Sequence, residues 1–267
     1  MSTVLYLILF FIYAGFGAYV WGFWQNRPND EYPIKKELSI LAPVLLVHSW
    51  LIWSPILSGH MVLLGFGAAL NLITWLMLLM YFCGNFFYSL KGLQILLYPL
   101  ASLSLLVAIL LPGETSGYPI QDIPFIIHIA SSILAYCLFA IAALFAVLIF
   151  LVERDLRLRK FSALMRFLPS LLSLEKLMFQ AIWAGFILLS ISVATGTIFS
   201  ESVFHKPFEW THKSIFGVFS WVIYAILILC RMLLSWRGKK AVWLALIGFV
   251  SLMFAYVGSK FILALLG

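Results

Sequence analysis

The chain has 267 residues, of which 64% are hydrophobic and only 10% are charged, and its mean hydropathy is +1.08. This composition excludes a water-soluble globular domain and predicts a polytopic membrane protein. The net charge of +7 does not indicate nucleic-acid binding, because the sequence has no soluble basic domain that could carry such a surface.

Long apolar runs follow one another along the whole chain. A helix needs about 20 apolar residues to cross a hydrocarbon core about 30 Å thick. Eight runs reach that length, and in chain order they predict membrane-spanning helices at residues 3–24, 38–57, 60–87, 92–111, 124–152, 176–199, 214–235 and 241–266. The expected fold class is therefore an all-α integral membrane protein, a bundle of eight transmembrane helices forming a single polytopic domain over residues 1–267.

The basic residues of the connecting segments predict the orientation of these helices. Short loops rich in Lys and Arg stay on the cytoplasmic side of the membrane. Of the 17 Lys and Arg residues, 14 follow the first, third, fifth or seventh predicted helix, and only Lys206, Lys213 and Lys260 fall on the other side. Both termini are therefore expected outside, in the periplasm or its equivalent.

The longest connection between predicted helices runs from Glu153 to Glu175. Within it, Phe161 to Leu174 alternates apolar with basic and Ser residues, which predicts a segment lying along the inner membrane surface. Docking to anionic lipid and docking to a cytoplasmic partner both remain open. Pro169 argues against one continuous helix there.

Several chemistries have no support in the sequence. The three cysteines, Cys83, Cys137 and Cys230, are isolated and form no Cys-x-x-Cys pair, so neither a thiol-disulfide exchanger nor a zinc site is indicated. All acidic residues fall in loops or at helix ends, which disfavours an ion-coupled transporter. Paired catalytic carboxylates, a Ser-His-Asp order and a glycine-rich phosphate loop are absent, so we expect no enzyme.

The five histidines are the main candidates for a functional site. His48 lies about ten residues from each end of its predicted helix, near the bilayer midplane, where a neutral imidazole must be hydrogen-bonded or act as a ligand. Both readings of His48 remain open, and nearby Trp50 and Trp53 are consistent with an aromatic cavity or with simple packing. His60 and His205 are expected to be solvated residues at the membrane surface.

Short motifs recur in a fixed order from His128 onward. The first is the helix start His128-Ile-Ala-Ser-Ser-Ile-Leu-Ala-Tyr136, followed by Leu174-Glu175-Lys176-Leu177, Gly185-Phe186 and Thr195-Gly196-Thr197-Ile198-Phe199. The last are Trp210-Thr211-His212-Lys213, Trp221, Arg231, Trp236-Arg237-Gly238, Gly248-Phe249 and Ala255-Tyr256-Val257-Gly258. In this order and spacing the motifs resemble the cytochrome c assembly family, the CcsA/ResC and HemX-like membrane proteins associated with haem delivery.

The resemblance is strong over residues 124–267, the part similar to the cytochrome c assembly core, and weaker over residues 1–123. The tryptophan-rich haem loop of the family, WGxxWxWDxKE, keeps only Trp210 and Lys213 here, with Thr211 in place of the Asp. Two further family histidines fall on Leu229 and Gly267. The pattern is most similar to the shorter YpjD/HemX-like inner-membrane branch, whose haem loop is degenerate.

The resemblance implies a bacterial inner-membrane protein that handles haem during assembly of c-type cytochromes or cytochrome complexes. It implies haem, bound permanently or in transit, in the outer half of the bundle, with His128 as an axial iron ligand, His48 or His212 as another, and Trp210 as an aromatic wall. The expected partners are the lipid bilayer, haem and a cytochrome assembly or tetrapyrrole-synthesis protein, and no nucleic acid.

Two other functions remain open from the sequence. One is a cofactor-free HemX-like scaffold or regulator that uses the basic cytoplasmic loops, above all Arg154 to Lys160. The other is a transporter of a metal or small solute, lined by polar side chains such as Asn71, Thr74, Ser102 and Ser104.

Overall fold

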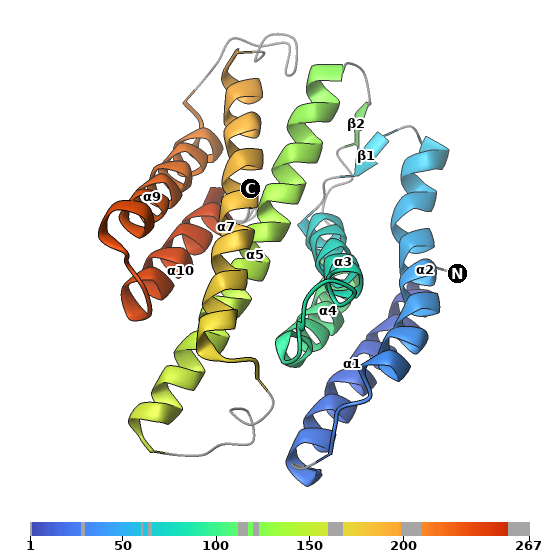
Figure 1. Cartoon of the computed structure of the whole chain (residues 1–267). Helices are drawn as coiled ribbons and strands as arrows, with labels where there is room; N and C mark the ends of the chain where they lie inside the picture. Colours follow the sequence, from blue (N-terminus) through green and yellow to red (C-terminus); the bar gives the residue numbers. More distant parts are fainter. Residues whose placement is uncertain are drawn as a thin grey trace. The chain divides into compact units, whose positions relative to one another are not determined.

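A computed structural model describes residues 2–27, 30–59, 61–63, 66–111, 117–119, 123–159, 168–198 and 210–255. The described residues are mostly helical, as the sequence predicts. The helices are α1 (Ser2–Asn26), α2 (Ile34–Gly59), α3 (Phe66–Gly84), α4 (Leu93–Leu110), α5 (Ile123–Arg157), α7 (Leu171–Ile198), α9 (His212–Leu234) and α10 (Lys239–Met253) (Figure 1). The described residues also form two short strands, β1 (Met61–Leu63) and β2 (Gly117–Pro119).

Seven of these helices, α1 to α5, α7 and α9, are long and apolar enough to cross a membrane. The protein is therefore a multi-pass membrane protein. In the described part of the chain α10 has 15 residues, about 22 Å of helix at 1.5 Å per residue, and the rest of the predicted span 241–266 lies outside the described residues beyond Ala255.

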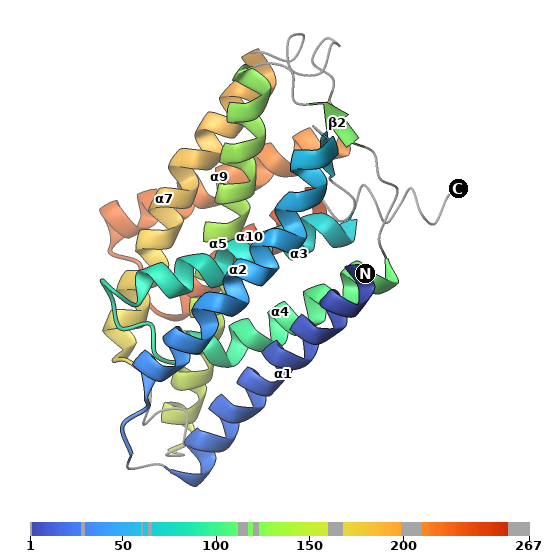
Figure 2. The same cartoon turned by 90° about the vertical axis from the view of Figure 1, so that its right-hand side faces the viewer.

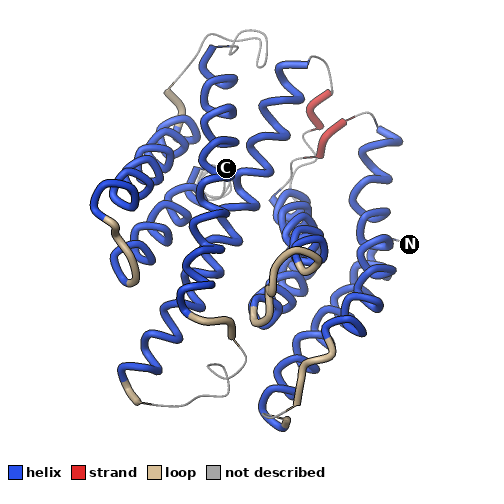
Figure 3. The backbone as a smooth tube through the Cα atoms, in the orientation of Figure 1, coloured by secondary structure: helices blue, strands red, loops and turns tan. Residues whose placement is uncertain are grey.

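Three predicted helix starts differ from the structure by four or more residues. The second helix begins at Ile34, not at residue 38. The third helix begins at Phe66, not at residue 60, because Met61, Val62 and Leu63 pair antiparallel with Pro119, Tyr118 and Gly117 (Figure 3). The sixth predicted helix begins earlier than residue 176, at Leu171, two residues after Pro169. The end of the predicted surface segment thus belongs to α7, and residues 160–167 of that segment lie outside the described residues.

The chain divides into two compact units. Unit 1 comprises Met1–Pro119 and Leu151–Ser170, and unit 2 comprises Ile120–Phe150 and Leu171–Gly267. In unit 1, α1 lies along α4, α4 lies along α3, and α2 packs against α3 (Figure 2). α3 approaches α4 closely because Gly67 has no side chain. A Cβ at Gly67 would lie 2.7 Å from the Cα of Ala108. Small residues permit such close approach between membrane helices.

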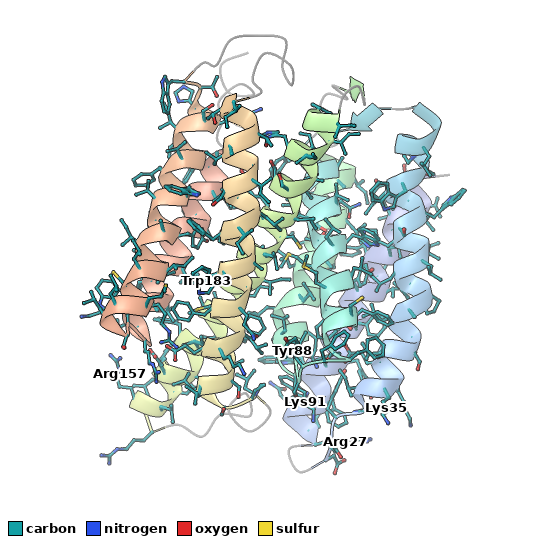
Figure 4. The ribbon with its side chains drawn as sticks, turned by 45° about the horizontal axis from the view of Figure 1, so that its top comes forward. Arg27, Lys35, Tyr88, Lys91, Arg157 and Trp183 are labelled. Carbon is teal, nitrogen blue, oxygen red and sulfur yellow. The ribbon has the colours of Figure 1, made fainter. Side chains whose placement is uncertain are left out.

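Basic residues gather at one end of unit 1. Figure 4 shows Arg27, Lys35 and Lys91 at the end opposite the β1–β2 pair. Arg27 follows α1, Lys35 lies in the first turn of α2, and Lys91 precedes α4. The charge pattern of the sequence predicts that these residues lie together on the cytoplasmic face, and their common location is consistent with that prediction.

The core of unit 2 is an aromatic stack between two glycines. The ring centroids of Phe139 on α5 and Tyr224 on α9 lie 3.8 Å apart, and the two rings are nearly parallel. Phe139 packs against Gly185 on α7, and Tyr224 against Gly248 on α10, where a Cβ would lie 3.1 Å and 2.9 Å from the respective ring atoms. Side chains at Gly185 and Gly248 would therefore separate the helices, which gives two glycines of the sequence motifs a structural role.

Candidate functional site

His128 lies in unit 2, about one and a half turns into α5, and is half-buried. Its Nδ1 atom is 3.0 Å from the main-chain oxygen of Ser192 and 3.3 Å from Oγ1 of Thr195, both on α7. A main-chain oxygen only accepts hydrogen bonds, so Nδ1 carries the proton and the neutral ring has its lone pair on Nε2. Histidines that bind a metal through Nε2 are commonly held by such an Nδ1–H bond to a carbonyl oxygen.

Small and hydroxylated residues bring α5 and α7 together around this imidazole. Gly196 lies against the ring, since a Cβ there would be 3.0 Å from Cε1 and 3.3 Å from Nδ1 of His128. One turn deeper, the hydroxyls of Ser132 and Ser192 are 2.6 Å apart, and Ser132 also donates to the main-chain oxygen of His128. The position of the ring is therefore fixed from both helices, and Gly196 of the Thr-Gly motif leaves room for it.

Trp210 and His212 lie where α9 begins, also in unit 2. Figure 1 shows α5 beginning, α7 ending and α9 beginning at the same end of this unit. Thr211 caps α9 by accepting a hydrogen bond from the main-chain N–H of Ser214 at 3.3 Å. Trp210 is 68% exposed, and His212 is exposed as well. Three of the four predicted haem-site residues, His128, Trp210 and His212, thus belong to one end of one unit.

The fourth predicted site residue, His48, lies in unit 1 and is completely buried. Its Nδ1 is 3.0 Å from the hydroxyl of Tyr13, and its Nε2 is 3.0 Å from Oδ1 of Asn71. The Asn71 carbonyl oxygen accepts from Nε2–H, so Nδ1 accepts from Tyr13. Both ring nitrogens are therefore engaged, and an iron atom could reach one only after a hydrogen bond is broken.

The surroundings of His48 also differ from the aromatic cavity considered from the sequence. Trp50 is 70% exposed and Trp53 is 38% exposed, whereas Tyr13 is the ring that lies against the imidazole. Of the polar side chains considered as a transport path, Asn71 bonds to His48, and the other three bond to one another or to helix backbone. Oγ1 of Thr74 is 2.7 Å from Oγ of Ser104, and Ser102 donates to the main-chain oxygen of Pro99.

His60 and His205 lie outside the described residues. Within the part of the chain that the structure describes, no three His, Cys, Asp or Glu side chains are grouped to hold a metal ion. A bare metal ion would need several protein ligands. Haem iron takes four ligands from the macrocycle and needs only one or two from the protein, so isolated histidines fit haem better.

Two buried carboxylates were not anticipated from the sequence. Glu37 lies in the first turn of α2 and Glu175 just after the first turn of α7, but their exposed fractions are only 4% and 7%. Oε1 of Glu175 accepts from the main-chain N–H of Gly238 at 2.9 Å and lies 3.5 Å from Nη1 of Arg231. Glu175, Arg231 and Gly238 all belong to the motifs from which the family resemblance was drawn, so three of those motifs meet in one ion-paired contact of unit 2.

Glu37 has a different environment in unit 1. Its Oε1 accepts hydrogen bonds from the hydroxyls of Tyr81, at 2.9 Å, and Tyr98. The sequence placed Glu37 only among the acidic residues in loops or at helix ends, and its burial was not predicted. A signal was present in the sequence, because three tyrosines, Tyr32, Tyr81 and Tyr98, lie near the predicted cytoplasmic ends of neighbouring helices.

Comparisons with known proteins agree with the motif analysis. Residues 39–266 match the sequence model of the family described as cytochrome C assembly protein, a longer region than the strongly similar half noted from the motifs. The chain is 28% identical over 167 residues to the inner membrane protein YpjD of Escherichia coli K12, covering 62% of each protein. It is 30% identical over 90 residues to the cytochrome c biogenesis protein CcsA of Porphyra purpurea, covering 34% of this chain and 28% of that protein.

A 28.8 kDa protein of Azospirillum brasilense is 32% identical over 136 residues, or 51% of this chain and 50% of that protein. The chain thus spans less than two thirds of the length of these relatives. No solved structure matches the chain at a significant level.

Proposed function

The chain belongs to the cytochrome c assembly protein family, and from that membership we propose that it binds haem through histidines at one end of unit 2. In this role the protein is a haem-handling component of cytochrome c or cytochrome-complex assembly in the bacterial inner membrane, and it acts by binding rather than as an enzyme. The observation that carries the proposal is the orientation of His128 by the main-chain oxygen of Ser192.

The site lies in the outer half of the membrane under the proposed topology. In that topology eight helices span the membrane in one polytopic domain, and both termini face the periplasm. The gathering of Arg27, Lys35 and Lys91 at one end of unit 1 supports this orientation (Figure 4). The start of α5, which carries His128, then faces outward because α5 ends in Arg154 and Arg157, which are basic.

The described residues fit one imidazole ligand for haem iron. His128 is the Nδ1–H tautomer, in which Nε2 is the nitrogen that can bind iron, and the exposed indole of Trp210 offers an apolar surface for a macrocycle at the same end of unit 2. Haem supplies an iron atom that accepts neutral imidazole, and as the cargo of an assembly protein it is passed to a partner. His212, exposed at the start of α9, is the second ligand that unit 2 offers.

His48 fits haem less well, because both of its nitrogens are hydrogen-bonded. We therefore assign His48 to the packing of unit 1. It would become an iron ligand only in a conformation that separates it from Tyr13 or Asn71.

Haem titration of the purified protein tests this proposal. We expect the wild type to bind haem with a Soret band typical of histidine ligation, and a His128→Ala variant to bind at least tenfold more weakly, since a lost ligand bond exceeds about 1.4 kcal/mol. A His48→Gln variant serves as the matched control and should bind as the wild type does. Equal binding by all three proteins, or none by the wild type, would contradict the proposal.

The scaffold function predicts a different result. A scaffold that acts through its inner loops would depend on Arg154, Arg157 and Arg159 and not on His128. If the protein instead binds haem through His128, cytochrome c maturation in cells should fail in His128→Ala and persist when the three arginines are changed to Gln. The reverse pattern would identify the protein as a cofactor-free scaffold.

A further inference from the structure

Glu37 is a buried carboxyl group for which the structure offers no positive partner. Its exposed fraction is 4%, and within the described residues no Lys, Arg or His lies within 4.0 Å of its oxygens. Lys91 pairs instead with Glu31 at 3.8 Å, and Arg27 lies over the ring of Phe23. Glu175, the other buried carboxyl group described, has Arg231 beside it.

The two oxygens of Glu37 differ in their hydrogen bonds. Oε1 accepts from Tyr81 and Tyr98, which uses both of its lone pairs. Within the described residues, buried Oε2 meets no hydrogen-bond partner of good geometry, and the same holds for the hydroxyl of Tyr32, which is 5% exposed. Tyr32 lies close enough to Glu37 for the two side chains to interact. Burial raises the pKa of Tyr32 well above its usual range, so Tyr32 stays a neutral hydroxyl.

A buried carboxylate without a counter-charge costs several kcal/mol, so the site must take up a cation or a proton. Metal cations bound through oxygen take about six or more ligands. Among the described residues around Glu37, only two oxygens lack partners of good geometry, one on Glu37 and one on Tyr32. Two oxygens suit a single hydrogen bond, with a proton on one and a lone pair on the other.

We propose that Glu37 is a proton-binding site, whose carboxyl group carries a proton on Oε2 at neutral pH and donates it to the Tyr32 hydroxyl oxygen. Binding converts the carboxylate to the acid by uptake of one proton, while Oε1 continues to accept from Tyr81 and Tyr98. The titratable groups that face this site are Tyr32, Tyr81 on α3 and Tyr98 on α4. The charged residues nearest in the sequence, Lys35 and Lys36 on α2, are exposed, and Lys91 pairs with Glu31. Since Arg27, Lys35 and Lys91 lie at the same end of unit 1 (Figure 4), the proton exchanges with the cytoplasmic side.

Infrared spectroscopy of the purified protein tests this site, because protonated and ionised carboxyl groups absorb in separate regions. At pH 7 we expect one carbonyl band of a protonated carboxyl that shifts in D₂O, disappears in Glu37→Gln and persists in Glu175→Gln. The ion-paired Glu175 is the matched control, as it is buried in a similar way. A wild type without this band, or a band that persists in Glu37→Gln, would overturn the proposal.

Two further measurements keep the test decisive if Glu37→Gln folds poorly. Tyr32→Phe removes the proposed acceptor and should shift the band to the frequency of a free carboxyl group without abolishing it. The band should also be the same in sodium, potassium and choline buffers. An unchanged band in Tyr32→Phe, or loss of the band in one alkali salt, would contradict a proton shared with Tyr32.

Discussion

The Nδ1 atom of His128 donates to the main-chain oxygen of Ser192 across 3.0 Å, which joins α5 to α7 near the end of unit 2 where α9 begins. This bond fixes both the orientation of the imidazole and its tautomer. His128 and Ser192 are more than 60 residues apart in the sequence. The bond explains why the histidine and serine pair of the α5 motif occur in the same sequence pattern as the Thr-Gly motif of α7. The predictions below depend on this bond and on the polar contacts that stabilise each unit.

Enlarging Gly196 should weaken haem binding without unfolding the protein. In Gly196→Ala the new Cβ would lie 3.0 Å from Cε1 of His128, so the ring must move. Such overpacking costs about 1–3 kcal/mol, and we expect haem affinity to fall about tenfold or more. Gly217→Ala on α9 is the control, because no atom lies within 4 Å of its new Cβ. Equal affinities for the two variants in a haem titration would argue against a ring position set by Gly196.

Replacing Asn71 should destabilise unit 1 and leave haem binding intact. Asn71→Leu leaves the Nε2–H group of His48 buried without an acceptor, a loss of about 1–3 kcal/mol in the free energy of unfolding. Unfolding in detergent by heat should show a lower midpoint than for the wild type. Trp50→Leu, at a position 70% exposed, should change the midpoint little. Loss of haem binding in Asn71→Leu at a temperature where the variant is folded would indicate that His48 is part of the haem site.

Removing Arg231 should destabilise unit 2 more than removing its neighbour Arg237. Arg231 lies 3.5 Å from buried Glu175, donates to the main-chain oxygen of Trp236 and stacks 4.5 Å from the ring centroid of Phe179. Arg231→Ala leaves the Glu175 carboxylate without its cation, which typically costs about 3–5 kcal/mol for a buried pair. The exposed Arg237 serves as a control of equal charge. If both variants unfold at the same temperature, the Glu175–Arg231 pair does not stabilise the fold.

A side chain at Gly248 should disturb the aromatic stack at the centre of unit 2. The Cβ of Gly248→Ala would lie 2.9 Å from Cζ of the buried Tyr224, and we expect a loss of about 1–3 kcal/mol. Gly15→Ala on α1, with no atom within 4 Å, should be neutral or slightly stabilising. Thermal unfolding in detergent compares the two, and the opposite order would show that α10 can move away from Tyr224 at no cost.

The helices of this protein were predictable because length and apolarity alone select membrane-spanning segments. The start of α3 was not, since three-residue strands at Met61–Leu63 and Gly117–Pro119 carry too few residues for a pattern and pair across a long stretch of chain. The single-domain prediction and the outward direction of the termini remain predictions.

The candidate site was predictable only in part. His128 was marked by its motif, but its acceptor, the main chain of Ser192, has no side-chain signature in a sequence. The burial of Glu37 was not predicted, because its partners Tyr81 and Tyr98 lie 44 and 61 residues further along the chain. The burial of a polar group at a helix end depends on which neighbouring helices cover it, and sequence position alone does not report that.

Imidazole rescue of the His128→Ala variant is the most direct test of histidine-ligated haem in unit 2. The account predicts that the reduced α and β bands of the haem-loaded wild type are lost in His128→Ala and return when free imidazole is added, because the vacated space beside Gly196 admits the ring. A variant that keeps the wild-type bands without imidazole would contradict His128 as the iron ligand.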